Sequence, residues 1–271
     1  MTLADQGFLD LGDMQLEYRM SGPRPADVPT IVMLHEGLGC VGLWNAFPNQ
    51  LAAATGAGVF LYSRAGYGQS SPVSMPRPLT FMHDEARDVL PRLLDAIGFR
   101  RGLLLGHSDG ASIATIYAGS VQDHRVRGLI LIAPHFFTEE VGIAEIARAK
   151  DAYETTDLRV KLARWHVDVD NAFHGWNDAW LDPDFRTWDI TTELAYIRVP
   201  ILIVQGADDQ YGTVKQIETA ERECYCPVEV SLLSGVRHAP HREAPDALLT
   251  MTSEFANRLL RDHQEGAIHA A

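Results

Sequence analysis

Residues 102–113 read Gly-Leu-Leu-Leu-Gly-His-Ser-Asp-Gly-Ala-Ser-Ile, an apolar run that leads into a G-x-S-x-G sequence. The apolar run predicts a buried strand, and the residues after the motif predict the start of a helix. In this setting Ser108 lies on a tight strand-to-helix turn that projects its hydroxyl above the sheet, while Gly106 and Gly110 allow the backbone to approach closely. The helix N-terminus behind the serine favours developing negative charge. Ser108 is therefore the candidate nucleophile.

Four other stretches of the chain accompany this motif. They are Ile31-Val32-Met33-Leu34-His35-Glu36-Gly37-Leu38-Gly39 with Trp44 downstream, Tyr62-Ser63-Arg64-Ala65-Gly66-Tyr67-Gly68-Gln69-Ser70, Gln205-Gly206-Ala207-Asp208-Asp209, and Gly235-Val236-Arg237-His238-Ala239-Pro240-His241-Arg242-Glu243-Ala244-Pro245. Together with residues 106–110 they resemble the α/β-hydrolase superfamily over nearly the whole chain. Glu36 departs from the glycine that is usual in its loop, and Ser63 stands where aspartate is common.

The resemblance implies an α/β-hydrolase fold, with a mostly parallel, doubly wound sheet and an inserted helical lid. It also implies that residues 31–39 form the oxyanion loop and that residues 62–70 are a structural marker of the family. Residues 205–209 and 235–245 are similar to the loops that carry the catalytic acid and histidine.

The hydrophobic pattern predicts the same α/β class. An alternating hairpin is expected at residues 8–11 and 14–18, around Gly12-Asp13. Strands covered on both faces are expected at 30–34, 58–62, 102–105, 128–132 and 201–204, with a further strand at 228–233. The clearest helical patterns are residues 80–97, where Pro91 is expected to introduce a kink, and residues 246–260. Alternation of strand and helix predicts right-handed crossovers, with catalytic groups at the carboxyl ends of the strands.

A long stretch of helical character interrupts this alternation. It predicts a hydrolase core of residues 1–134 and 196–271, with residues 135–195 inserted as a lid. Four of the five tryptophans fall in this lid: Trp165, Trp176, Trp180 and Trp188. Aromatic surface above a reactive serine suits an apolar substrate pocket, although each tryptophan can instead pack the lid onto the core. His135, Trp176 and Trp180 are the residues expected to line the pocket.

The same stretch contains His166, Asp168, Asp170 and His174. Their spacing matches no metal-binding loop, so no metal ion and no cofactor are predicted.

The serine needs a base and an acid. His238 is the predicted base because it follows the last strand at the Gly-x-x-His spacing, and His241 is the alternative. Asp209 is the predicted acid because it follows the strand ending near residue 204, whereas the side chain of neighbouring Asp208 should point elsewhere. The resulting order, serine then aspartate then histidine, is the order of α/β-hydrolases.

Backbone amides are the predicted oxyanion donors. One belongs to Asp109, directly after the nucleophile, and the other to Gly37, at the donor position counted from His35 to Trp44. Neither role uses a side chain. Two interpretations of Glu36 therefore remain, a buried acid that tunes the pocket or a loop residue hydrogen-bonded to its neighbours.

Composition narrows the class of protein. The chain has 271 residues, 46% of them hydrophobic, and a formal net charge of −13, which disfavours nucleic acid and anionic membranes as partners. No apolar run reaches 18 residues and no signal peptide is recognised, so a cytoplasmic protein is predicted. Cys40, Cys224 and Cys226 are expected to be reduced thiols. A monomer or a homodimer is expected.

A serine at the nucleophile position implies acyl transfer and disfavours dehalogenases and epoxide hydrolases, which use aspartate there. The leading hypothesis is hydrolysis of a small carboxylic ester or lactone through an acyl-serine intermediate, acting on a largely apolar small molecule. The alternative is carbon–carbon bond hydrolysis of a ring-cleavage diketone, for which lid arginines are candidate anion ligands: Arg148, Arg159, Arg164 and Arg186. Perhydrolysis and a non-catalytic ligand receptor are further possibilities.

Overall fold

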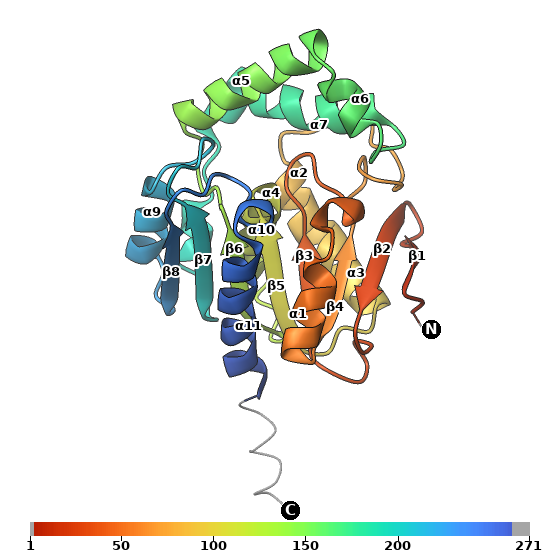
Figure 1. The fold of residues 1–271 in the computed structure, drawn as a ribbon, viewed down its shortest axis with the longest axis vertical. Helices are drawn as coiled ribbons and strands as arrows, with labels where there is room; N and C mark the ends of the chain where they lie inside the picture. Colours follow the sequence, from red (N-terminus) through yellow and green to blue (C-terminus); the bar gives the residue numbers. More distant parts are fainter. Residues whose placement is uncertain (1–2, 262–271) are drawn as a thin grey trace, which may run out of the picture.

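The computed structural model describes residues 3–261 of the chain. Its centre is an eight-stranded sheet with the order β1-β2-β4-β3-β5-β6-β7-β8, and helices cover both faces of this sheet (Figure 1). Six neighbouring strands from β4 to β8 run parallel, and β1 and β2 are antiparallel. The predicted α/β class and mostly parallel, doubly wound sheet are thus confirmed.

The N-terminal hairpin is shifted slightly from its predicted bounds. β1 spans Gln6–Asp10 and β2 spans Gln15–Ser21. Leu11 donates its backbone N–H to the carbonyl of Met14 across the turn, and Gly12 has a φ of +92°, a conformation that glycine adopts readily. Residues 11 and 14 therefore belong to the turn and not to the strands.

The parallel strands match the predicted apolar runs and in three cases extend beyond them. The strands are β3 (Thr30–Leu34), β4 (Gly58–Tyr62), β5 (Gly102–His107), β6 (Val126–Ile132), β7 (Ile201–Gly206) and β8 (Val228–Leu233). β5 continues through Gly106 and His107, because the strand runs directly into the serine turn. All residues of β3, β4, β5 and β7 are buried, as expected of strands with helices on both sides.

Two apolar clusters pack on opposite faces of the sheet. Alternate residues of β3 divide between them: Ile31 and Met33 face one cluster, and Val32 and Leu34 face the other. The first cluster includes residues of α1 (Phe47–Thr55) and α11 (Pro245–Arg261), which lie side by side (Figure 1). The second includes residues of α3 (Leu90–Ala96), α4 (Asp109–Ser120) and α9 (Lys215–Glu223).

The helical pattern at residues 80–97 forms three consecutive pieces. They are α2 (Phe81–Asp84), a π-helical turn at Glu85–Val89, and α3. Pro91 lies in the first turn of α3, where its missing N–H removes the least hydrogen bonding. The wide turn just before the proline takes the place of the simple kink that the sequence predicts.

The segment between β6 and β7 is helical, as predicted. It contains α5 (Glu140–Thr155), α6 (Leu158–Leu162), α7 (Val169–Leu181), a 3₁₀ turn at Pro183–Thr187 and α8 (Thr191–Leu194). Figure 1 shows α5, α6 and α7 above the sheet, whereas α8 packs against α4 and α9 of the core. No helix among the described residues has the length and apolar character needed to cross a membrane.

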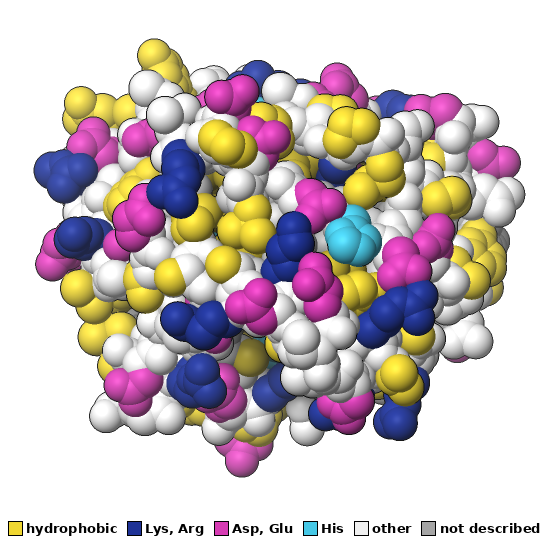
Figure 2. All heavy atoms as spheres, turned by 90° about the horizontal axis from the view of Figure 1, so that it is seen from above, with side chains coloured by type: hydrophobic (Ala, Val, Ile, Leu, Met, Phe, Trp, Pro, Cys, Tyr) yellow, Lys and Arg dark blue, Asp and Glu magenta, His cyan; other side chains and the backbone are white. Residues whose placement is uncertain are grey.

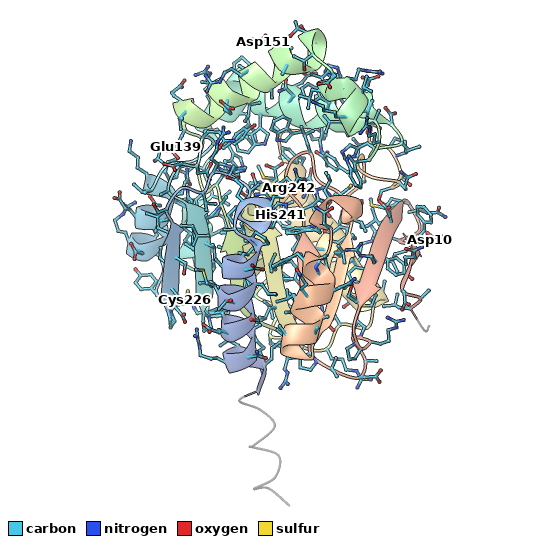
Figure 3. All side chains as sticks on the ribbon, in the orientation of Figure 1. Asp10, Glu139, Asp151, Cys226, His241 and Arg242 are labelled. Atoms are coloured by element: carbon cyan, nitrogen blue, oxygen red, sulfur yellow. The ribbon has the colours of Figure 1, made fainter. Side chains whose placement is uncertain are left out.

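One polar junction joins this segment to the loop after β7. The carboxylate of Glu139 accepts hydrogen bonds from the backbone and hydroxyl of Thr213, at 2.9 and 2.7 Å, and from Nε2 of Gln216 at 2.9 Å. Figure 3 shows Glu139 just before α5, close to the upper end of the sheet. The start of α5 is therefore attached to α9 and its preceding loop.

The serine turn depends on two glycines. A Cβ on Gly106 would collide with the carbonyl of Gly110, and a Cβ on Gly110 would collide with the carbonyl of Leu34. Ser108 itself has a φ of +53°, which is strained for a residue with a side chain. Close backbone packing therefore holds the turn in a conformation that it would not adopt alone.

We predict that Gly106→Ala lowers the free energy of unfolding by about 3 kcal/mol, because the added methyl group meets backbone that has no room to move. Gly175→Ala in α7 is the matched control, since a Cβ there has its nearest neighbour 3.7 Å away. Urea denaturation of both variants measures the effect. Equal midpoints for Gly106→Ala and the wild type would contradict the close-packing account.

Candidate active site

Three predicted catalytic side chains meet at the carboxyl ends of the strands. Nε2 of His238 lies 3.0 Å from Oγ of Ser108. Nδ1 of His238 lies 2.9 Å from each carboxylate oxygen of Asp209. Because a carboxylate only accepts hydrogen bonds, Nδ1 carries the proton and Nε2 is free to accept the serine proton. The arrangement has the geometry required of a nucleophile, a base and an orienting acid.

Sheet topology explains why residues 130 positions apart meet. Ser108 follows β5, Asp209 follows β7 and His238 follows β8, and these strands lie in the order β5-β6-β7-β8. Gly206 closes β7 at a point where a Cβ would collide with the carbonyls of Val236 and Arg237. This glycine therefore lets the histidine loop cross close to the end of β7.

The structure separates the two candidate aspartates. The Asp209 side chain is 1% exposed and also accepts a hydrogen bond from the N–H of Tyr211 at 2.8 Å. Burial alone would raise the pKa of Asp209, but the hydrogen bond and charge of His238 hold this pKa below its ordinary value. Asp208 is exposed. The preference for Asp209 therefore agrees with the geometry.

The alternative base, His241, lies away from the serine. It sits in α10 (Pro240–Glu243), with its ring 5.1 Å from Trp44 and 5.0 Å from His107 between ring centroids. Burial lowers the pKa of His241 to about 3. His238 is thus the histidine placed to receive the proton of Ser108.

Two backbone amides point to a site for an oxyanion. In residues 3–261, the N–H groups of Gly37 and Asp109 are paired with no backbone acceptor. Asp109 begins α4, so its amide also lies at the positive end of a helix. Gly37 lies under the indole of Trp176, which a Cβ at residue 37 would strike. The predicted donors are therefore both located beside the nucleophile.

A buried arginine holds the loop after β3 in place, and sequence reasoning did not assign it a role. The guanidinium of Arg64 donates hydrogen bonds to the carbonyls of His35 and Glu36, the latter at 3.1 Å. It also lies 3.9 Å from the carboxylate of Asp109, which follows the serine. The only sequence signal was its place in the marker segment 62–70. Arg64 thus connects the loop that carries one predicted oxyanion donor to the residue that carries the other.

His35 supports the same loop as a neutral ring. Its Nδ1 donates to the carbonyl of Glu36 at 2.6 Å, and its Nε2 accepts from the N–H of Arg64 at 3.0 Å. Burial, together with the charge of Arg64, holds the pKa of His35 well below its ordinary value.

Ser63 stands where the family commonly has aspartate. Its hydroxyl accepts a hydrogen bond from the N–H of Val41 and donates one to the carboxylate of Glu17.

A cavity of about 110 Å³ opens above Ser108. The three predicted lining residues are on its wall, with others that the sequence did not indicate: Leu38, Ile146 and Tyr211. Trp176 closes one side, and Trp180 donates its indole N–H to the carboxylate of Asp109 at 3.2 Å. The pocket is small and mainly apolar.

His135 is the exception on this wall. Its ring centroid lies 5.6 Å from that of His238, and burial lowers its pKa to about 3, so the imidazole is neutral near pH 7. The other two tryptophans of residues 135–195 lie elsewhere. Trp165 packs over Gly42 and is 38% exposed, and Trp188 stacks on Phe185.

The arginines considered as anion ligands do not line the cavity. Three of them form ion pairs on the outer surface: Arg148 with Glu145, Arg159 with Asp170, and Arg186 with Glu140. Figure 2 shows the molecule from above, where acidic and basic side chains are interspersed among hydrophobic ones.

A separate partner binds each of the four residues whose spacing matches no metal-binding loop, His166, Asp168, Asp170 and His174. Nε2 of His166 donates to the carbonyl of Leu38, and its Nδ1 accepts from Gly68. The Asp168 carboxylate caps α7, Asp170 binds Arg159, and His174 lies beside Asp178. These four side chains therefore do not converge on one metal site.

The carboxylate of Glu36 lies 3.5 Å from Nδ1 of His107, the residue before the nucleophile. Burial alone would raise the pKa of Glu36, but the neighbouring His107 and the other nearby histidines hold it well below its ordinary value. Glu36 lies on the wall of the cavity above Ser108, and its backbone carbonyl accepts a hydrogen bond from Arg64.

Comparison with known proteins agrees with this geometry. A model of the alpha/beta hydrolase family matches residues 31–250. The chain belongs to this family. It is 26% identical over 230 residues to 2-hydroxy-6-oxo-6-phenylhexa-2,4-dienoate hydrolase of Comamonas testosteroni, covering 74% of this chain and 77% of that one.

Two solved structures share the hydrolase fold. A membrane phospholipase A described as a bacterial virulence factor aligns with a TM-score of 0.76 and 21% identity, covering 95% of this chain and 86% of that one. The enol-lactonase of Burkholderia xenovorans LB400 aligns with a TM-score of 0.72 and 22% identity, covering 92% of this chain and 99% of that one. The predicted family and hydrolase fold are confirmed.

For this hydrolase we predict that Asp209→Asn lowers kcat for an activated ester by about 10³- to 10⁴-fold, because the amide no longer selects the imidazole tautomer with Nδ1 protonated. Asp208→Asn is the matched control and should change kcat less than about threefold. Steady-state kinetics of both variants make the comparison. The opposite ranking would identify Asp208 as the acid.

Proposed function

We propose that the protein is a serine hydrolase that cleaves a small carboxylic ester or lactone through an acyl-serine intermediate. The hydrogen-bonded series from Ser108 through His238 to Asp209, at 3.0 and 2.9 Å, supports this most directly. A serine hydroxyl is a weak nucleophile until a base removes its proton, and His238, with Nε2 3.0 Å from Oγ, stands in position to do so.

The proposed reaction has two halves. In the first, Oγ of Ser108 attacks the substrate carbonyl while its proton passes to Nε2 of His238, and the amides of Gly37 and Asp109 stabilise the oxyanion. His238 then gives the proton to the leaving alcohol. In the second, His238 takes a proton from water, the hydroxide attacks the acyl-serine, and the acid leaves as Ser108 regains its proton.

The pocket supports a small and mainly apolar acyl group. Its volume of about 110 Å³ is bounded by Trp176, Trp180 and Ile146 from the 135–195 segment. We propose that this segment acts as the lid of a core formed by residues 1–134 and 196–271, with the junction at Glu139 as one fixed end. Covering the site with apolar side chains excludes bulk water and strengthens the electrostatic interactions inside it.

The relative from Comamonas testosteroni keeps carbon–carbon bond hydrolysis as the second candidate. A ring-cleavage dienoate is an anion and requires a cationic partner in the pocket. Among the described residues, the cavity wall contains no arginine or lysine, whereas it contains Glu36 and Asp109. This charge distribution favours a neutral ester or lactone.

The test of the reaction is labelling with a fluorophosphonate, which reacts with activated serines. We predict an adduct on Ser108, located by mass spectrometry, together with turnover of p-nitrophenyl esters or lactones. Ser108→Ala should abolish labelling and lower turnover by roughly 10⁴-fold or more while the circular dichroism spectrum stays unchanged. Turnover of a diketone but of no ester would favour the second candidate, and absence of labelling in folded protein would favour a receptor.

The pocket volume predicts a preference for short acyl chains. We expect kcat/KM for p-nitrophenyl esters to be highest for acetate or butyrate and to fall by about 10-fold or more for decanoate. Trp176→Ala should shift the preference toward longer chains, because it removes one wall of the cavity. Trp165→Ala is the matched control, since that tryptophan lies outside the pocket. A preference for decanoate in the wild type would refute this assignment.

A further inference from the structure

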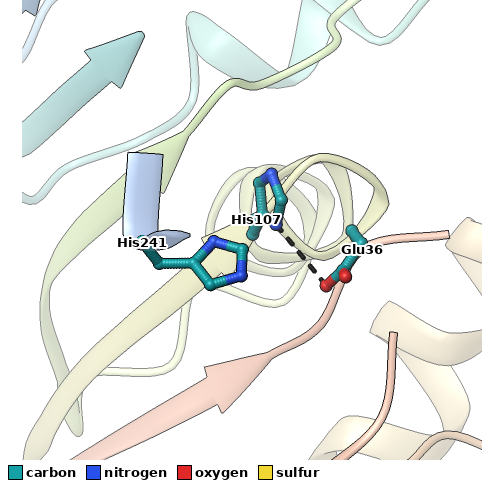
Figure 4. A group of neighbouring side chains, drawn as sticks. All are labelled: Glu36, His107 and His241. Atoms are coloured by element: carbon teal, nitrogen blue, oxygen red, sulfur yellow. Dashed lines mark ion pairs between the residues drawn. The ribbon is translucent and has the colours of Figure 1, made fainter. Parts of the chain in front are cut away.

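Three side chains meet beside the serine turn without taking part in the proposed reaction. Glu36 comes from the loop after β3, His107 ends β5, and His241 lies in α10. One ligand atom from each lies within 4.8 Å of the other two, and Figure 4 shows the three side chains converging. Figure 3 shows His241 at the upper end of the sheet.

The hydrogen bonding of His107 leaves one nitrogen without a partner. Its Nε2 lies 2.8 Å from the backbone carbonyl of His238, which can only accept, so Nε2 carries a proton. In the neutral ring Nδ1 then carries a lone pair, and this buried atom has no hydrogen-bond partner among the described residues. His107 is 1% exposed, so bulk solvent does not reach this atom.

The separation between His107 and Glu36 suits two ligands of one ion. Nδ1 of His107 lies 3.5 Å from Oε2 of Glu36, longer than the ~2.8 Å of a charge-assisted hydrogen bond. With metal–ligand bonds of about 2.0–2.1 Å, a tetrahedral site places neighbouring ligand atoms about 3.3–3.4 Å apart. At this distance either a proton on Nδ1 or a metal ion between the two atoms compensates the negative charge of the carboxylate.

His241 supplies a third donor. Its side chain is nine-tenths buried, and Nδ1 has no hydrogen-bond partner in the described part of the chain. Two neutral imidazoles and one carboxylate are the ligand set of many zinc and other divalent transition-metal sites. The three ligand atoms lie within 4.8 Å of one another, so binding one ion requires the widest pair to approach by up to about 1.4 Å through side-chain rotation.

A second cavity gives an ion a route that avoids the substrate pocket. It has a volume of about 270 Å³ and includes Glu36, His107 and His238 on its wall, together with Arg237, Arg242 and Glu243. Glu36 also lines the cavity above Ser108. Glu36 therefore borders both cavities, and Glu36 and His107 are the two proposed ligands that the second cavity reaches.

We propose that Glu36, His107 and His241 bind a divalent transition-metal ion of the zinc type. The N–H···O=C bond from His107 to His238 is the support that metal-binding histidines commonly have, and it connects the ion to the backbone of the catalytic base. The ion would thereby position the His238 loop. This role explains a carboxylate where the family resemblance leads one to expect glycine, and it differs from the metal-free site that the sequence predicts.

The test uses protein without an affinity tag, stripped with a chelator and titrated with zinc chloride or cobalt chloride. We expect one equivalent of zinc in calorimetry, and visible cobalt absorption typical of a four-coordinate site. Glu36→Gln and His241→Gln should each weaken binding by about 100-fold or more. Zinc should also raise the Tm of the wild type but not of these variants.

Two controls separate this site from other sources of binding. His174→Gln removes a histidine from the exposed His174–Asp178 pair, 3.2 Å apart, and should bind zinc as the wild type does. Ser108→Ala should bind zinc normally although it is inactive, so failure of the metal site and failure of the proposed reaction remain distinguishable. Absence of stoichiometric binding, or unchanged affinity in Glu36→Gln, would overturn the proposal.

Discussion

The contact between the serine turn and the end of β3 is the constraint on which the site depends. Gly110 lies so close to the carbonyl of Leu34 that no side chain fits between them. The turn that carries Ser108 and the loop that begins at His35 are therefore held at a fixed separation. Arg64 completes this unit, because it binds the loop carbonyls and lies beside Asp109. The proposed nucleophile and both proposed oxyanion donors thus belong to one rigid assembly.

The meeting of Ser108, Asp209 and His238 could be predicted from the sequence, because each of these residues follows a strand of a parallel sheet. Apolar runs located β5, β7 and β8, and parallel strands place the residues that follow them at one edge of the sheet. The choice of Asp209 over Asp208 required only the direction of successive side chains. Boundaries were less predictable at β1 and at Pro91, where a turn and a π-helical segment replace the expected geometry.

What the sequence did not reveal depends on contacts between distant segments. Arg64 lies in a recognised motif, yet its bonds to the carbonyls of residues 35 and 36 require the folded backbone. The same limit applies to the tryptophans of the 135–195 segment. Trp176 and Trp180 line the cavity, while Trp165 does not. All three are tryptophans of one segment, so residue type alone does not distinguish them. Tertiary packing, which no local pattern encodes, makes that distinction.

The indole of Trp176 above Gly37 couples two distant positions of the chain. Any side chain at residue 37 requires a smaller residue at 176, because both would occupy the same space. A smaller residue can replace Trp176 first, because Gly37 makes no demand on the size of residue 176. A wider cavity at this position is therefore expected to evolve in one order of mutation, with residue 176 changing before residue 37.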